Sequence, residues 1–418
     1  MTQLAVPPVS LCQDEMPLLL ACLRAYFGTA STADLHHFTE PDWQMLTQKS
    51  IASGVMPLFY QALKGMESLP ISKSHLLQFQ HLNRLNGLHN VSQFKELLRV
   101  LNLLRADRIE AIAFKGPVLA ISAYGNVALR QFNDLDVLVK LEDFWKAMAV
   151  LTANGYQSDR SRISESAMFA RNLQVSLQYC DSEATLLNRH FQPSLLHSNL
   201  ERSLDLHWGI QPRRVWNVGR FALLWQHQKV VTLMGQSVQT FSPEAMLVML
   251  CVSVARETGK RSLKQICDIA QIIRAHPELD WETALKLAAG LRCQRLFRLG
   301  LSITQALLHM PLPDLLQPQM PVLQSATEHM FQSDSEPTHP FVTEFTSQFN
   351  TLDRPWDALF LTVHLLRLLL MPRDPDHKVL LLSTRWTFLY YIFRPVRLLV
   401  KYALALLAKL SDRYRHYG

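Results

Sequence analysis

Two aspartates separated by one residue, Asp134 and Asp136, stand in the otherwise apolar segment "NDLDVLVK". In a β-strand the side chains of residues i and i+2 point to the same face, so the two carboxylates are expected to lie side by side. Ionised carboxylates at this spacing repel each other unless a cation compensates them. Mg²⁺ prefers hard oxygen ligands and binds through one or two carboxylates together with substrate phosphates. The pair therefore predicts a divalent metal site.

A Lys-Gly pair precedes these acids, at the end of the short apolar segment "IEAIAFKG". Without a side chain, Gly116 lets backbone amides approach a phosphate closely, and Lys115 can supply a counter-charge. Together with Asp134 and Asp136, the pair indicates a nucleoside triphosphate (NTP) that is held on a metal through its phosphates.

A second metal ion requires a third acid, because one ion must also activate the attacking group. Asp205 in "RSLDLHWGI" is our candidate, since it too lies in a strand-like segment. Glu201 and Asp181 are nearby alternatives. For His207 and Trp208, sheet packing and a hydrogen bond are favoured over catalysis.

An α/β unit is expected to position these residues. Strands alternate with helices over about 45 residues, and a Gly-Asn turn at 125–126 separates the first helix from the second strand. The predicted elements are a strand at 109–116, a helix at 117–124, a strand at 133–140 and a helix at 142–156 that ends at Asn154-Gly155. Further strands are expected within 168–210.

Helical tracts surround this unit, so we predict an α+β, mostly helical fold with a small mixed β-sheet between N-terminal and C-terminal helical regions. In the tract from 72 to 107, Gly87 is expected to mark a bend. The predicted regions are an N-terminal helical region (1–107), an α/β core (108–215), a helical domain (216–310), a linker (311–355) and C-terminal basic amphipathic helices (356–418).

Composition narrows the class of protein. Of the 418 residues 48% are apolar and 18% are charged, so most of the chain is expected to fold. Six cysteines without a CxxC pair indicate buried thiols in a reducing compartment. The N-terminus lacks the basic start of a secretory signal, and no uncharged apolar stretch reaches the roughly 18 residues of a membrane span. We therefore predict a cytoplasmic location.

Basic and aromatic residues gather in the C-terminal segment 385–415. The segment has two interpretations: an interfacial helix on the anionic inner face of a membrane, or a terminal helix docked on the protein's own core. The formal charge of +7 is not gathered into a basic stripe with interleaved aromatic residues elsewhere, so nucleic acid is disfavoured as a partner. The residues concerned are Trp386, Tyr390, Tyr391, Arg397, Lys401, Lys409 and Arg413.

The stretch "FKGPVLAISAYGNVALRQFNDLDVLV" resembles the polymerase-β-like nucleotidyltransferase superfamily, in which a glycine turn precedes an Asp-x-Asp strand and a later strand carries a third acid. More narrowly it is similar to a poorly characterised bacterial nucleotidyltransferase family. Further marks of that family are "LDLHW" at 204–208 and "RSLKQICDIAQII" at 261–273, and the resemblance covers about residues 15–310.

The resemblance implies catalytic and metal-binding roles for Asp134, Asp136 and Asp205, and nucleotide-binding roles for Lys115, Gly116 and Arg130. Arg130 matches an arginine shortly before the acids and is expected to contact a phosphate; a surface salt bridge is the alternative. The charged helical face of Lys260, Arg261, Lys264 and Asp268 is interpreted either as solvated or as holding the acceptor or the base.

The implied reaction is the Mg²⁺-dependent transfer of a nucleoside monophosphate from an NTP to an unidentified hydroxyl or phosphate acceptor, with release of pyrophosphate; Mn²⁺ is a second candidate cofactor. Pro117 departs from the superfamily, where Ser or Gly is usual, and offers neither a hydroxyl nor an N–H to a phosphate. A second hypothesis is therefore a non-catalytic nucleotide-binding or membrane-associated accessory protein in envelope polysaccharide assembly.

Overall fold

The computed structural model describes residues 15–30, 38, 41–66, 71–158, 194–197, 203–208, 222–256, 262–316 and 397. The chain divides into two compact units, and the first comprises Met1–Asp159, Phe191–Pro212 and Trp216–Asp353. Apart from Arg397, every described residue belongs to that unit. Apart from Arg397, the C-terminal segment 385–415, for which membrane binding was one of two interpretations, lies outside the described residues. So do residues 317–355 of the predicted linker and the alternative acids Glu201 and Asp181.

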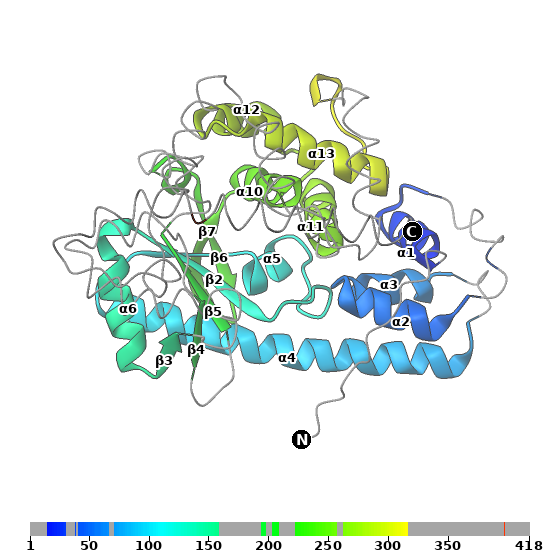
Figure 1. Cartoon of the computed structure of the whole chain (residues 1–418), viewed down its shortest axis with the longest axis horizontal. Helices are drawn as coiled ribbons and strands as arrows, with labels where there is room; N and C mark the ends of the chain where they lie inside the picture. The colour runs from blue at the N-terminus through cyan, green and yellow to red at the C-terminus, as the bar shows by residue number, and fades with distance from the viewer. Residues whose placement is uncertain are drawn as a thin grey trace. The chain divides into compact units, whose positions relative to one another are not determined.

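A five-stranded mixed sheet forms the centre of this unit, with the order β1-β2-β5-β4-β3 (Figure 1). The neighbouring strands β2 and β5 are parallel, and each of the other neighbouring pairs is antiparallel. The strands are β1 (Ala111–Phe114), β2 (Asp134–Val139), β3 (Tyr156–Ser158), β4 (Ser194–His197) and β5 (Ser203–His207). The predicted strands at 109–116 and 133–140 are therefore present, each shortened at its ends.

Helices and a hairpin flank the sheet. In Figure 1 the long helix α4 (Lys73–Ala106) runs below it, and α6 (Phe144–Ala153) follows the 3₁₀ turn η3 (Leu141–Asp143). The short helix α5 (Gly116–Ser122) joins β1 to β2. A hairpin of β6 (Gln228–Leu233) and β7 (Gln236–Phe241) follows α9 (Ala222–Trp225) and lies beside β1, where the Phe241 and Phe114 rings are 5.8 Å apart. This hairpin lies within residues 216–310, for which a helical domain was predicted, so that prediction is wrong for residues 228–241.

Three helices precede α4: α1 (Met16–Phe27), α2 (Trp43–Ala52) and α3 (Met56–Lys64). Helix α3 packs against α4, and α1 and α2 pack against α3. Their ends follow local chemistry. The Asp42 side chain accepts a hydrogen bond from the Met45 N–H at 2.9 Å and caps α2. Gly28 adopts the left-handed conformation at the end of α1, with φ of 74°.

Four further helices lie above the sheet in Figure 1: α10 (Pro243–Arg256), α11 (Ser262–Ala275), α12 (Trp281–Gly290) and α13 (Gln294–Leu308), followed by the 3₁₀ turn η5 (Asp314–Leu316). The predicted start of α10 at Ser242-Pro243 is confirmed, because the Ser242 hydroxyl accepts a hydrogen bond from Ala245 N–H at 3.3 Å. The close packing of α13 on α10 depends on Gly300, where a Cβ atom would lie 2.5 Å from the backbone of Cys251.

The mostly helical α+β class predicted from the sequence is confirmed. The cysteines in the described part of the chain, Cys22, Cys251, Cys267 and Cys293, are buried free thiols. Burial raises the pKa of Cys22 to about 12. Among the described residues, no helix is both long enough and apolar enough to cross a membrane.

Candidate functional site

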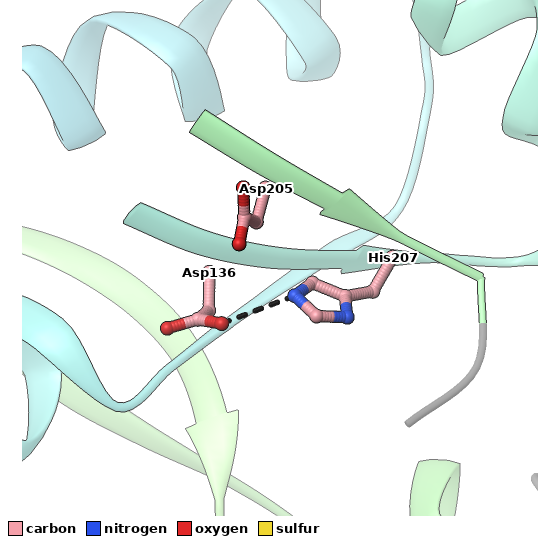
Figure 2. Close-up of side chains that lie close together, drawn as sticks. All are labelled: Asp136, Asp205 and His207. Carbon is pink, nitrogen blue, oxygen red and sulfur yellow. Dashed lines mark hydrogen bonds and ion pairs between the residues drawn. The ribbon is translucent and has the colours of Figure 1, made fainter. Parts of the chain in front are cut away.

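Two of the predicted acids meet on neighbouring strands. Asp136 of β2 pairs in register with Asp205 of the parallel strand β5, so both side chains point to the same face of the sheet. His207 lies two residues further along β5 on that face. One ligand atom from each of these three buried side chains lies within 4.8 Å of those from the other two (Figure 2). The structure thus brings Asp136 and Asp205 together and adds a histidine.

Asp134 stands at the first position of β2 and is only half-buried. It shares a face with Asp136 because of the two-residue period of the strand, as predicted. Among the described residues, however, the group of ligand atoms within 4.8 Å consists of Asp136, Asp205 and His207. Asp134, Asp136 and Asp205 together form what we call the acid row. Asp134 stands at its more accessible end, two residues before Asp136 on β2.

His207 contacts the site in two ways. Its Nε2 atom lies 3.0 Å from Oδ1 of Asp136, which fixes the orientation of that carboxylate (Figure 2). Its ring packs edge-on against Phe114 of β1, with 4.9 Å between the ring centroids. Packing and a hydrogen bond, the roles favoured for His207 from the sequence, are thus observed. The same nitrogen is also within reach of a cation held by the two carboxylates.

The environment of Asp136 keeps its carboxylate ionised. Burial alone would raise the pKa, but the charge of Lys115, the hydrogen bond and charge of His207, and the charge of Arg130 together hold the pKa at about 2. Two ionisable carboxylates with an adjacent imidazole are suitable ligands for a divalent cation, and the carboxylates favour Mg²⁺ or Mn²⁺. The residues present therefore fit the predicted metal.

The Lys-Gly turn approaches these acids through an unusual backbone. Lys115 has φ of 56° and ψ of −140°, and Gly116 has φ of 32°. A Cβ atom at Gly116 would lie 3.3 Å from the backbone oxygen of Asp134, so glycine permits the close approach. A non-glycine residue in such a conformation costs on the order of 1–3 kcal/mol, and such strain is concentrated at functional sites.

Pro117, the departure from the superfamily pattern, has a structural explanation. It lies in the first turn of α5, where a helix leaves backbone N–H groups without helical partners. The missing N–H of proline therefore costs the helix nothing, and its fixed φ suits the position. The residue starts α5 directly after the Lys-Gly turn.

Arg130 forms a buried salt bridge with α11. Its Nε and Nη2 atoms donate to the two carboxylate oxygens of Asp268, each at 2.8 Å, and the Tyr124 hydroxyl donates to Oδ1 of Asp268 at 2.8 Å. Arg130 and Asp268 are 4% and 0% exposed, so neither a surface salt bridge nor a solvated face at this part of α11 is correct. The phosphate contact of Arg130 stays a prediction.

A row of polar side chains on α4 holds the loop that leads into β2. The donors are spaced three or four residues apart and hydrogen-bond to backbone carbonyls between residues 127 and 133: Asn86, Asn90 and Gln93 donate, and His89 joins them through Nε2. Gly87 leaves room for Ala128, whose Cβ would be 3.3 Å from an added Cβ. α4 is a single helix through Gly87, so its predicted role as a bend is replaced by close packing.

This row was not predicted from the sequence, although the helically spaced Asn, His and Gln residues in "NGLHNVSQF" are a visible signal of it. Helix α4 thus positions the acids from outside the sheet.

Comparisons with known proteins identify the family of the chain. A family model described as an uncharacterised nucleotidyltransferase matches residues 39–309. An antigenic nucleotidyltransferase-like protein from Paracoccidioides brasiliensis, known from a crystal structure, is 16% identical over 58% of this chain and 93% of that chain, with a TM-score of 0.26. No curated protein matches the chain significantly. Because the family model spans well over half of the sequence, the chain belongs to the uncharacterised nucleotidyltransferase family, a family of transferases.

Proposed function

We propose that the protein is a divalent-metal-dependent nucleotidyltransferase that transfers a nucleoside monophosphate from an NTP to a hydroxyl or phosphate acceptor and releases pyrophosphate. The observation that carries this proposal is the in-register pair of buried carboxylates, Asp136 and Asp205, beside the Lys115-Gly116 turn. The family assignment supports the reaction class.

Mg²⁺ or Mn²⁺ would be held by Asp136 and Asp205, with Asp134 at the accessible end of the row and His207 beside Asp136. When bound, such an ion neutralises phosphate charge and lowers the pKa of a coordinated hydroxyl. The low pKa of Asp136 means that this carboxylate need not lose a proton before it binds a cation near neutral pH.

The chain's own residues would contribute positioning and charge. Lys115 would offset the charge of the phosphates, and the amides near Gly116 would approach them closely. The acceptor's oxygen would bond to the α-phosphorus of the NTP while the bond from that phosphorus to pyrophosphate breaks. Asp205 would accept the proton that the acceptor's hydroxyl loses. Most of the rate enhancement is expected from orientation and electrostatic stabilisation, as in other phosphoryl transfers.

The test is incubation of the purified full-length protein with each of the four α-labelled NTPs and Mg²⁺ or Mn²⁺, while labelled products and pyrophosphate release are measured. We expect Asp136→Asn and Asp205→Asn to reduce turnover by about 100-fold or more, the scale of losing one electrostatic contact to the transition state. Glu142→Gln, at an exposed position outside the site, is the matched control and should keep full turnover. Undiminished turnover in Asp136→Asn would refute the assignment of this site as the nucleotidyltransferase active site.

The second hypothesis, nucleotide binding without transfer, is favoured by one observation: Pro117 removes an N–H from the first turn of α5. It predicts NTP binding with no labelled product in any reaction above. Membrane association through residues 385–415 also stays a prediction, and binding of the full-length protein to anionic liposomes measures it.

A further inference from the structure

Lys264, in the first turn of α11, has no part in the mechanism above, although its amine lies within electrostatic range of two of the acids. Asp134 and Asp136 both act electrostatically on its amine, as do Arg130 and Asp268. Its side chain is half-buried, and among the described residues it forms no ion pair. A positive charge within electrostatic range of the two carboxylates is therefore available for a ligand.

Helix α11 is held firmly enough to place this lysine. One turn after Lys264, Asp268 receives hydrogen bonds from Arg130 and Tyr124. A further contact is made by Gln271, whose Nε2 donates to the backbone oxygen of Ala123 at 2.8 Å. Residues i and i+4 lie on one face of a helix, so Lys264 lies on the face of α11 that packs through Asp268 against Arg130 and Tyr124.

The stem of Lys264 has a fixed course. A Cβ atom added at Gly54, in the turn between α2 and α3, would lie 3.0 Å from Cδ of Lys264 and 3.2 Å from its Cβ. The methylene groups therefore pack on a backbone that has no side chain of its own. Contacts of this kind reduce the rotamer freedom of the lysine before a ligand binds, which lowers the entropy cost of binding.

Burial lowers the pKa of Lys264, as does the charge of Arg130, whereas Asp268, Asp134 and Asp136 oppose this effect. A triphosphate bound at the acids would relieve the unfavourable environment, because it brings negative charge next to a partly desolvated ammonium group. Lysine side chains that clamp phosphoryl groups stabilise the charge of such substrates in this way.

We propose that Lys264 binds a phosphate group of the NTP, together with Lys115, and that α11 thereby completes the nucleotide site. This proposal rests on the proposed nucleotidyltransferase function. It assigns part of the substrate site to α11, which lies outside the sheet. A lysine that served only as a counter-ion for Asp134 and Asp136 would instead leave nucleotide affinity unchanged.

Equilibrium titration of the full-length protein separates these roles. The probes are the four NTPs with Mg²⁺ and, separately, Mn²⁺ alone. We expect Lys264→Met, which retains an unbranched stem for packing on Gly54, to weaken NTP binding about tenfold or more, because one charge-assisted contact is lost. The same variant should bind Mn²⁺ alone equally or more tightly, because a like charge has been removed.

Lys286→Met is the control, since Lys286 is exposed and pairs only with Glu282 among the described residues. Lys264→Gln provides a second neutral variant, and thermal unfolding checks that each variant is folded. If the wild type binds an NTP and both folded Lys264 variants bind it equally well, this proposal is overturned while the proposed function stands. If the wild type binds none of the four NTPs, both the proposed function and the role of Lys264 are refuted.

Discussion

Replacing Asp268 by asparagine is expected to destabilise the protein by about 3–5 kcal/mol, because the change leaves a buried guanidinium without its counter-charge. The side chains of Arg130 and Asp268 are only 3% and 0% exposed, so water cannot replace the lost carboxylate. Asparagine has nearly the shape of aspartate, which makes the loss one of charge and hydrogen bonding rather than of volume.

The magnitude follows from the contacts of Asp268. Its carboxylate accepts two bonds from Arg130 and one from Tyr124, each at 2.8 Å. Hydrogen bonds to charged groups contribute about 1.5–3 kcal/mol each, and asparagine keeps one acceptor oxygen while its NH₂ group faces a donor. Removing both charges in the Arg130→Met, Asp268→Leu double variant is expected to cost less than the two single changes together, with several kcal/mol of coupling.

Urea unfolding of the wild type, Asp268→Leu, Arg130→Met and the double variant measures this coupling, and Asp268→Asn is measured beside them. Glu282→Gln is the control, because its ion pair with Lys286 is exposed and should be worth about 1 kcal/mol or less. A loss of less than about 1 kcal/mol in Asp268→Asn, or additivity of the two single changes, would contradict a strongly coupled buried pair, since the typical penalty for breaking such a pair is larger.

Two further predictions concern packing and pH. Gly300→Ala would place a methyl group 2.5 Å from the Cys251 backbone and should lower the free energy of unfolding by about 1–3 kcal/mol. Gly65→Ala is the control, because the nearest atom to its added methyl group is 3.6 Å away and stability should change little. Thermal unfolding compares the two variants. Because the pKa of Asp136 is lowered from 3.8 to about 2, its contribution to stability, of order 2 kcal/mol, is present above about pH 4 and is lost as the pH falls toward 2. Acid unfolding of the wild type and Asp136→Asn measures it, and equal pH dependence would contradict the assigned pKa.

The acid row could be predicted because its signals are local. Asp134 and Asp136 share a face by the two-residue period of a strand, and the apolar residues after them indicated a buried strand. Placing Asp205 opposite Asp136 required more, since the strand that carries it lies about seventy residues downstream; there the family resemblance supplied what periodicity could not.

Other features depend on contacts between distant segments. Nothing near Arg130 in the sequence identifies Asp268, 138 residues away, as its partner, and a charged helix resembles a solvated one until its packing is known. The β6–β7 hairpin did carry a local signal, because Gly235 lies between two segments with high β-propensity. Residues 216–310 were nevertheless predicted to be helical, because apolar helical segments make up most of that region.

The charges around the site explain why a helix outside the sheet is needed. In the part of the chain that the structure describes, four carboxylates lie at or near the site with three basic side chains, and His207 adds a positive charge when it is protonated. Without that charge one negative charge remains in excess: Asp134, Asp136, Asp205 and Asp268 against Lys115, Arg130 and Lys264. A site of this balance attracts a divalent cation, and with two cations it becomes net positive and attracts a triphosphate. Asp268 neutralises Arg130 within the core, so the positive charge that α11 offers to a substrate is that of Lys264. The sheet with its acids and Lys115 alone could bind the metal and offset part of the phosphate charge, but it would lack the second lysine that we assign to phosphate binding.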